Sequence, residues 1–260
     1  MATSPGGSIA PLDIGSDICR SDKDHIVIRG HDLVGDLMGR IGIAEMFYLE
    51  VMGRLPTPAQ ARLLEAMTVA VVEHGMMPST IAARMTDYGS PDSLQSAVAA
   101  GLLGAGTRIL GSMEKCAQML WEAKPADRSD PDALAEEIVA GYLRRKAQIP
   151  GLGHPIHKPE DPRARKLFDM ARTEGVAGTY IDFLHRVSAA CDRAMGKHLT
   201  INATAAIASV GLDIGLDWRA IKGVALVART IGIIAHVIEE KDHPTAWEIT
   251  RYVGAVVEGK

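Results

Sequence analysis

A glycine-flanked histidine, followed at fixed spacing by a lysine and an arginine, is the part of this 260-residue sequence with the clearest chemical potential. The segment 151–163 begins Gly-Leu-Gly, continues with His154 and Lys158, and ends with Arg163 in an Asp-Pro-Arg motif. Glycine lets the backbone approach a ligand closely, histidine moves a proton near neutral pH, and arginine binds a carboxylate through two parallel hydrogen bonds. Together they suit a polyanionic substrate whose hydroxyl or carbonyl oxygen exchanges a proton. A surface turn before a helix is the alternative for this segment taken alone.

Two further residues have settings that suit ligand binding. Arg229 lies in an otherwise apolar helical stretch, where an unpaired charge is costly. A ligand carboxylate or a structural Asp or Glu must therefore meet its guanidinium group. His74 is expected at the end of an amphipathic helix, where side chains commonly face a cleft, and a hydrogen-bonded core histidine is the alternative.

Helical periodicity dominates the stretches that must position these residues. Thr57 is a predicted helix cap and Gln60 completes a capping box with it, so a helix is expected to begin there and to run to Gly75. Similar signals predict further helices that begin near Pro91, Asp130, Tyr180 and Trp218. Only residues 26–28 suggest a strand. The sequence therefore predicts an all-α protein.

Composition narrows the class of protein. The formal net charge of −4 disfavours nucleic acid as a partner. The basic cluster 144–146 is expected to be a solvated helix end, and attraction of phosphates is the alternative. The cysteines Cys19, Cys116 and Cys191 are widely separated, which favours free thiols in a reducing compartment. We see no metal-ligand spacing, no signal peptide and no apolar stretch long enough to span a membrane. A cytoplasmic protein that binds neither a metal nor a membrane is expected.

Several motifs in order along the chain extend the pattern of the 151–163 loop. They are Leu55-Pro56, Glu73-His74-Gly75, Ser79-Thr80, Asn202 and Ala228-Arg229-Thr230-Ile231-Gly232. Through them the chain resembles the citrate synthase superfamily, and most of all the citryl-CoA lyase module that also forms the C-terminal part of ATP citrate lyase. The resemblance covers nearly the whole chain.

The resemblance implies a citrate synthase-like, all-α homodimer with a large helical domain and a smaller, mobile helical domain that closes over the substrate. The large domain would comprise residues 1–122, with a flexible tail at 1–20, together with residues 218–260. The small domain would comprise residues 123–217, because the polar, proline-containing segment 123–130 is the best internal boundary.

The resemblance also implies roles for individual residues. His74 and His154 would contact the substrate and act in catalysis, with His154 polarising a carbonyl or handling the hydroxyl proton. Arg163 and Arg229 would bind substrate carboxylates. Coenzyme A would be part of the substrate and not a tightly bound cofactor. Its predicted contacts are Gly151, Leu152, Gly153, Lys158, which would meet the phosphates, and Asn202.

Three positions depart from the family pattern. Thr204 stands at the position of the family's catalytic aspartate and is predicted as a catalytic residue there, although its hydroxyl exchanges hydrogen bonds and is no carboxylate-strength base. The Leu-His-Gly motif of the synthase branch is replaced by Leu110-Gly111-Ser112, as expected for the lyase branch. Pro155 stands where an arginine usually follows the loop histidine. Asp213 and His157 are conceivable substitutes for the missing aspartate.

The sequence thus predicts a lyase that cleaves citryl-CoA, or a related hydroxyacyl-CoA, to acetyl-CoA and oxaloacetate or another 2-oxo acid. A synthase-like acyltransferase running in the condensing direction is one alternative. A non-catalytic homologue that binds a carboxylate or an acyl-CoA is another. No Gly-x-x-x-x-Gly-Lys-Ser/Thr element is present, so an ATP-driven step is not expected.

Overall fold

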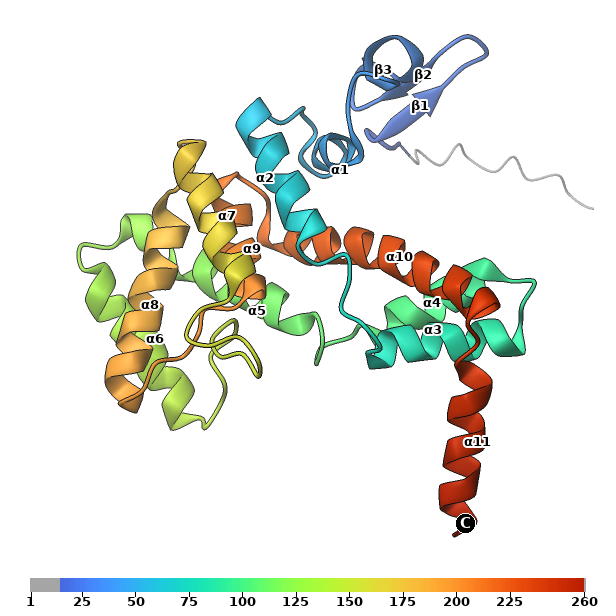
Figure 1. The fold of residues 1–260 in the computed structure, drawn as a ribbon. Coiled ribbons are helices and arrows are strands. Elements are labelled where there is room, and N and C mark those ends of the chain that lie inside the picture. The colour runs from blue at the N-terminus through green and yellow to red at the C-terminus, as the bar shows by residue number, and fades with distance from the viewer. Residues whose placement is uncertain (1–14, 260) are drawn as a thin grey trace, which may run out of the picture. The chain divides into compact units, whose positions relative to one another are not determined.

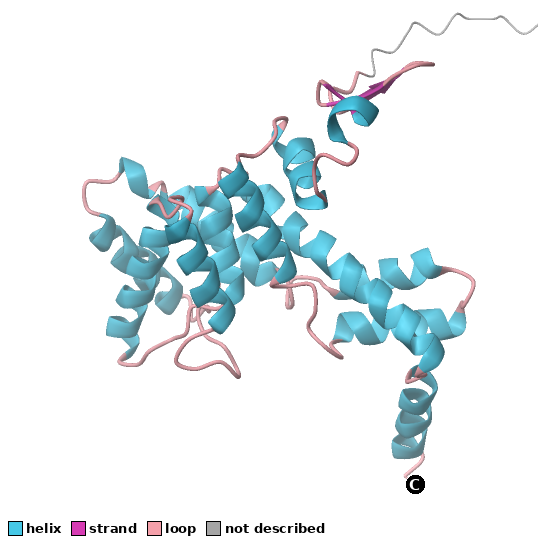
Figure 2. Ribbon diagram, turned by 45° about the horizontal axis from the view of Figure 1, so that its top comes forward, coloured by secondary structure: helices cyan, strands magenta, loops and turns pink. Residues whose placement is uncertain are grey.

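The computed structural model describes residues 15–259, so most of the predicted tail lies outside the described residues. The chain divides into two units, residues 1–55 and residues 56–260. Helices dominate the described part and the strands are confined to one small sheet, which confirms the all-α prediction (Figure 2). The division into a large and a mobile small domain remains a prediction.

The first unit contains a three-stranded antiparallel sheet of order β1-β2-β3. Its strands are β1 (Cys19–Ser21), β2 (Ile26–Ile28) and β3 (His31–Asp32). Strand β2 is the segment that the sequence predicts as a strand, and its Ile28 pairs with Cys19 of β1. A short helical turn (Leu33–Leu37) and helix α1 (Ile43–Met52) follow the sheet.

The second unit is helical throughout its described part (Figure 1). Its helices are α2 (Pro58–Val69), α3 (Pro78–Gly89), α4 (Leu94–Gly104), α5 (Gly111–Ala123), α6 (Pro131–Arg144), α7 (Pro162–Thr173), α8 (Thr179–Met195), α9 (Ala203–Asp213), α10 (Trp218–Asp242) and α11 (Ala246–Val257), with a single 3₁₀ turn at Pro125–Asp127. The predicted helix starts near residues 91, 130, 180 and 218 are confirmed within a few residues.

Helix α10 is the central element of the second unit. It packs against α2, α3, α4, α5 and α9, and its inward face includes the buried residues Ile221, Ala225 and Ala228 (Figure 1). An 18-residue window of α10 has a mean hydropathy of 1.7, which meets the length and apolarity of a membrane-spanning helix, so the expectation that no stretch of the chain does so is wrong. The apolarity of α10 has a plain structural cause, since a helix surrounded by other helices needs an apolar surface on most sides.

The start of α2 is formed as predicted and its end is not. The Thr57 hydroxyl accepts a hydrogen bond from the Gln60 amide at 3.3 Å, and the Gln60 side chain accepts one from the Thr57 amide at 2.8 Å. The helix ends at Val69, before His74, so the expected continuation to Gly75 is wrong.

A long-range contact explains the early end of α2. A Cβ atom on Gly232 of α10 would lie 2.3 Å from the Val72 carbonyl oxygen, so the backbone of residues 70–77 approaches α10 too closely for any side chain there. The segment instead forms a turn in which the Glu73 carboxylate accepts hydrogen bonds from the amides of His74 and Gly75 at 2.7 and 3.0 Å. His74 therefore lies in a turn between α2 and α3, not at a helix end.

Candidate active site

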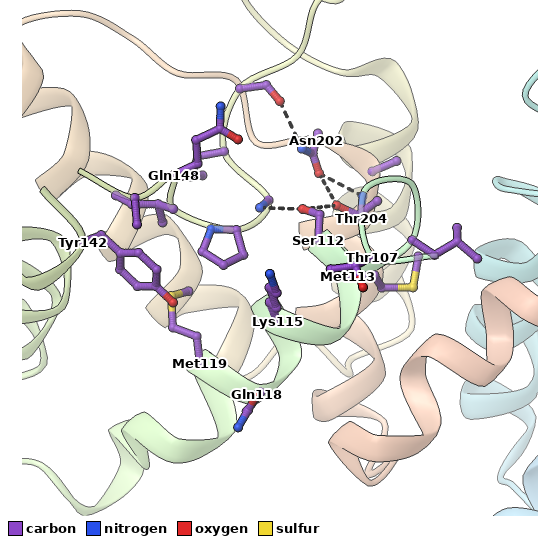
Figure 3. Close-up of a pocket in the computed structure, with 18 of the residues that line it drawn as sticks. Thr107, Ser112, Met113, Lys115, Gln118, Met119, Tyr142, Gln148, Asn202 and Thr204 are labelled. Carbon is purple, nitrogen blue, oxygen red and sulfur yellow. Dashed lines mark hydrogen bonds between the residues drawn. The ribbon is translucent and has the colours of Figure 1, made fainter. Parts of the chain in front are cut away.

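A pocket of about 1310 Å³ in the second unit contains nearly all the predicted site residues (Figure 3). Residues of α5, α6, α9 and α10 line it, together with the turn before α3 and the loop after α6. The predicted site residues in its lining are His74, Gly151, Leu152, Gly153, His154, Arg163, Asn202, Thr204 and Arg229. Lys158, Asp213 and His157 do not line it.

The glycine loop is held against α5 and α9 by its backbone. Gly151 has φ +84°, and a Cβ atom there would lie 2.4 Å from the Ala205 Cβ. Its amide donates to the Ser112 hydroxyl at 3.0 Å, and its carbonyl accepts from the Asn202 amide at 3.0 Å. Two residues later, the Gly153 amide donates to the Thr200 carbonyl at 2.7 Å. The loop is thus fixed at the floor of the pocket by contacts that only glycine permits at position 151.

Asn202 is the cap of α9 and its side chain also bonds to the glycine loop. Its Oδ1 accepts from the amides of Thr204 and Ala205 at 3.0 and 3.2 Å, and its Nδ2 donates to the Gly153 carbonyl at 3.0 Å. Asn202 therefore ties α9 to the glycine loop, and the second proton of its Nδ2, which bonds to no described residue, is left for a ligand.

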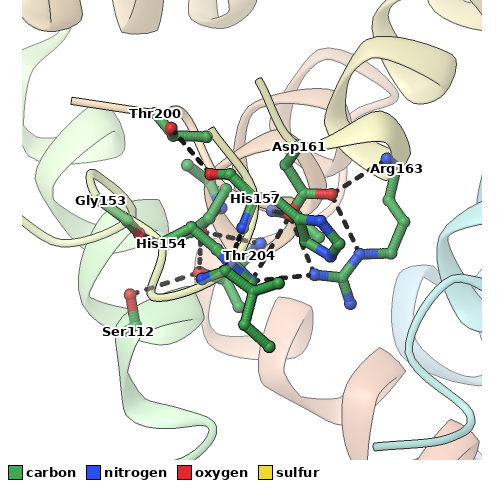
Figure 4. Close-up of polar contacts among 12 residues, drawn as sticks. Ser112, Gly153, His154, His157, Asp161, Arg163, Thr200 and Thr204 are labelled. Carbon is green, nitrogen blue, oxygen red and sulfur yellow. Dashed lines mark hydrogen bonds and ion pairs between the residues drawn. The ribbon is translucent and has the colours of Figure 1, made fainter. Parts of the chain in front are cut away.

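The imidazole of His154 is oriented by the backbone of its own loop (Figure 4). Its Nδ1 accepts hydrogen bonds from the amides of Ile156 and His157 at 3.1 and 2.9 Å. Nδ1 is therefore the unprotonated nitrogen, and the neutral ring carries its proton on Nε2. Burial lowers the pKa of His154, and the positive field of Arg163 adds to this against the opposing effect of Asp161. The ring is thus neutral with its proton on Nε2, and Nε2 lies 3.4 Å from Arg163 Nη2 and 4.0 Å from Asp161 Oδ2 in the pocket lining.

Asp161 holds the Arg163 guanidinium in place. Its side chain is fully buried and accepts hydrogen bonds from the Arg163 amide at 3.0 Å, from Arg163 Nε at 3.1 Å and from Arg163 Nη2 at 2.9 Å (Figure 4). The Ala203 amide of α9 donates to it as well, at 3.0 Å. Burial raises the pKa of Asp161, but these hydrogen bonds outweigh burial and bring its pKa below the ordinary value. The sequence analysis did not single out Asp161, although an Asp-Pro pair is a helix-start signal that could have done so.

Arg229 is a buried cation whose hydrogen bonds are incomplete. Its residue is 3% exposed, and its Nε and Nη1 atoms have no hydrogen-bond partner among the described residues. Burial lowers its pKa, while the nearby Glu73 carboxylate opposes that shift. The Glu73 carboxylate is itself engaged by His236 Nε2 at 3.0 Å and by the turn amides. The pocket therefore presents a guanidinium group with free donors, as expected for a site that binds a carboxylate.

His74 lies beside these cations. Burial lowers its pKa, and the charges of Arg229 and Arg163 lower it further. Among residues 15–259 no side chain hydrogen-bonds to its ring, whereas its amide is bound to Glu73. The ring is therefore a neutral base available to a ligand.

The pocket lining also includes four basic residues that were not predicted as site residues. Lys115 of α5, Arg128, and Arg144 and Arg145 at the end of α6 all line it. No described acidic side chain forms an ion pair with any of the four. Arg144 and Arg145 are exposed at the C-terminal end of α6, as expected for a solvated helix end, and they also line the pocket.

Comparison with known proteins agrees with this geometry. A model of the protein family "citrate synthase, C-terminal domain" matches residues 29–252. The chain belongs to the citrate synthase family. Among curated members it is 30% identical to the citrate synthase of Deinococcus radiodurans over 87% of this chain, and 29% identical to the 2-methylcitrate synthase of Shewanella oneidensis over 74% of this chain. It spans only 59% and 50% of the lengths of those two relatives.

The similar solved structures include one protein of similar size and one that is much longer. Citryl-CoA lyase from Hydrogenobacter thermophilus has a TM-score of 0.81 and 37% identity, with 88% of this chain and 87% of that chain covered. ATP citrate lyase from Methanothrix soehngenii, in complex with citrate and coenzyme A, has a TM-score of 0.78 and 21% identity, with 90% of this chain and 40% of that chain covered. The second likeness concerns the fold alone. The chain thus has the citrate synthase-like fold, and the predicted resemblance to citryl-CoA lyase is confirmed.

Proposed function

We propose that this citrate synthase-family protein is a citryl-CoA lyase-like enzyme, which cleaves citryl-CoA or a related hydroxyacyl-CoA to acetyl-CoA and oxaloacetate or another 2-oxo acid. The observation that carries the proposal is the pocket itself. Its lining contains two arginines and two neutral histidines, together with four cations that form no ion pair with a described acidic side chain. A substrate that carries both carboxylates and phosphates fits this concentration of positive charge.

The carboxylate end would be bound by Arg163 and Arg229. Arg163 is oriented by Asp161, and Arg229 has free donors in a buried setting. His154 would donate its Nε2–H to the oxygen of the carbinol carbon, which becomes the carbonyl oxygen of the 2-oxo acid.

Cleavage breaks the bond between the carbinol carbon and the α-carbon of the thioester. The hydroxyl proton passes to the neutral ring of His74, the carbinol becomes a carbonyl, and the electron pair of the broken bond forms the thioester enolate. The enolate carbon takes up one proton from water, and the imidazolium of His74 returns its proton to water. A base held neutral by burial and by neighbouring cations suits this step near neutral pH.

The phosphates of coenzyme A would be bound by Arg128, Arg144 and Arg145. These residues take the role that the resemblance assigned to Lys158, which does not line the pocket. Citryl-CoA lyase and citrate- and coenzyme A-bound ATP citrate lyase are among the similar structures, which supports coenzyme A as the carrier of the acyl group.

The direct test is incubation of the purified protein with citryl-CoA, with oxaloacetate followed by coupled reduction. We expect cleavage by the wild type, loss of at least about 100-fold in kcat for His154→Asn, and no change for His25→Asn, whose exposed side chain lies outside the pocket. No oxaloacetate from a folded wild-type protein would exclude citryl-CoA as the substrate.

Two other functions have support. The curated citrate synthase relatives favour a condensing acyltransferase, which would release free thiol from acetyl-CoA and oxaloacetate. Thr204 in place of the family's aspartate favours a non-catalytic homologue that binds a carboxylate or an acyl-CoA. Calorimetric binding of thioesters without turnover in either direction would identify the latter.

We also propose a cytoplasmic homodimer. Helix α11 buries only Ala246 and exposes a row of large apolar side chains, Trp247, Tyr252, Val253, Val256 and Val257. Such a face suits a second copy of the chain. Sedimentation of the wild type as a dimer and of Val253→Glu as a monomer would support this assembly.

A further inference from the structure

A pair of hydroxyl groups occupies the end of the pocket where the family's thioester-side catalytic groups are missing. Ser112 stands at the start of α5 and Thr204 at the start of α9, and both line the pocket (Figure 3). Their oxygens lie 3.3 Å apart. The two hydroxyls have different surroundings, and the difference decides which of them can serve a ligand.

The hydroxyl proton of Thr204 forms a hydrogen bond within the protein. Its hydroxyl lies 2.6 Å from Asn202 Oδ1. The oxygen and nitrogen of that amide are unambiguous, because Nδ2 donates to the Gly153 carbonyl while Oδ1 receives two backbone amides. A hydroxyl has one proton, so the short bond to Asn202 leaves Thr204 with none to offer the pocket.

The hydroxyl proton of Ser112 forms no strong hydrogen bond with a described residue. Its oxygen already accepts from the Gly151 amide at 3.0 Å, which fixes the position of the oxygen without using its proton. The one acceptor within reach among the described residues is the Thr204 oxygen at 3.3 Å, a long and weak contact for two hydroxyls. A ligand oxygen at ordinary hydrogen-bonding distance would accept a stronger hydrogen bond from the Ser112 hydroxyl than the Thr204 oxygen does.

The charge around Ser112 favours a negatively charged acceptor. Lys115 lies three residues further along α5, lines the same pocket and forms no ion pair with a described acidic side chain (Figure 3). No acidic side chain hydrogen-bonds to either hydroxyl among residues 15–259. This end of the pocket therefore provides a donor and a cation in place of a base.

We propose that Ser112 is a catalytic residue that donates its hydroxyl hydrogen bond to the thioester oxygen as that oxygen gains charge in the enolate. Thr204 is a positioning residue: it fixes the hydroxyl pair through Asn202 and does not itself donate to the substrate. This assignment rests on the proposed function for the identity of the substrate, and it transfers the role predicted for Thr204 to its neighbour.

The binding test uses carboxymethyl-CoA, whose carboxylate places negative charge where the enolate oxygen would be, and plain coenzyme A as reference. We expect the wild type to bind carboxymethyl-CoA more tightly than coenzyme A, and Ser112→Ala to lose at least about tenfold of that preference while its affinity for coenzyme A stays the same. Ser209→Ala is the matched control, since the Ser209 hydroxyl on α9 bonds only to helix carbonyls. An unchanged preference in Ser112→Ala would overturn the proposal.

The kinetic test separates donation from positioning. We expect Ser112→Ala to lower kcat for citryl-CoA by about 100-fold with KM changed less than threefold, because one oxyanion donor acts mainly in the transition state. Thr204→Ser should retain most activity, because it keeps the bond to Asn202. A larger loss in Thr204→Ser than in Ser112→Ala would reverse the two roles.

The two tests also separate this proposal from the proposed function. A wild type that prefers carboxymethyl-CoA through Ser112 but does not cleave citryl-CoA would retain the role of Ser112 and reject citryl-CoA as the substrate. Cleavage of citryl-CoA at the same rate by the wild type and by Ser112→Ala would support the proposed function and reject the catalytic role of Ser112.

Discussion

Arg84 and Arg229 are buried on neighbouring helices, but only Arg84 forms an ion pair with a described acidic side chain. Arg84 of α3 is 2% exposed and pairs with the Glu240 carboxylate at 2.8 Å. Arg229 of α10 is 3% exposed and has two guanidinium nitrogens without a partner among the described residues. Burying a charge without a partner costs free energy of folding, so Arg229 is retained at the expense of stability.

Replacement of each arginine by methionine should therefore have opposite effects on stability. We expect Arg229→Met to raise the free energy of unfolding by about 1–3 kcal/mol, because it removes a desolvated charge. Arg84→Met should lower it by about 3–5 kcal/mol, because it leaves Glu240 buried without its cation. Urea denaturation of the three proteins measures both changes. A destabilised Arg229→Met protein would mean that the guanidinium is satisfied within the protein.

The two pocket histidines predict the pH dependence of activity. Burial lowers the pKa of His74 and of His154, so each ring is protonated only at a pH below the ordinary histidine value of about 6.5. The neutral rings are the active forms, and activity is therefore retained as the pH falls to about 6.5 and is lost only below it. The pH profile of kcat/KM measures this loss of activity on its acidic side. An acidic limb above pH 6.5 would contradict the neutral histidines.

At the scale of secondary structure, the elements that were predictable are those set by local signals. The capping box of Thr57 and Gln60, the cap of α6 by Asp130 and the left-handed Gly196 that ends α8 each involve residues close in sequence. The turn at 70–77 was not predictable in the same way. It depends on the contact of Gly232 with Val72, which the fold brings together across most of the second unit.

In the candidate site, too, the features set by residues close in sequence were predictable and those set by long-range contacts were not. The positions of His154 and Arg163 could be predicted because one loop carries both. The pocket-facing position of Arg144 could not, because it depends on where the chain after α6 returns to α5. The hydroxyl pair of Ser112 and Thr204 joins the starts of two helices, and only the folded chain brings it together.

The glycine loop gives a prediction at this scale, with a built-in control. Gly151 and Gly153 both have positive φ, +84° and +94°, but only at Gly151 would a Cβ atom collide, at 2.4 Å from Ala205 Cβ. We expect Gly153→Ala to lower the free energy of unfolding by about 1 kcal/mol, from backbone strain. Gly151→Ala should cost about 3 kcal/mol or more, since α9 must also move. Thermal unfolding measures both, and equal losses would show that the close packing against α9 has no effect.

At the scale of the whole molecule, every residue assigned to the site belongs to the unit 56–260. The curated citrate synthase relatives are considerably longer than this chain, whereas the similar citryl-CoA lyase is not. The family's fold is therefore present, and in the proposed function its pocket would provide an anion-binding end with Arg163 and Arg229, an enolate end with Ser112, and basic residues for phosphates. The anion-binding end is the part on which the rest depends, since it fixes the acid whose bond is cleaved.

Calorimetric titration with oxaloacetate examines that end without requiring turnover. We expect the wild type to bind oxaloacetate and Arg229→Gln to bind it at least about 100-fold more weakly, because charge-assisted hydrogen bonds to a carboxylate contribute about 1.5–3 kcal/mol each. Arg172→Gln, which alters an exposed arginine paired with Asp169, should bind like the wild type. Equal affinity of the wild type and Arg229→Gln would contradict the assignment of this pocket to an oxygen-rich acid.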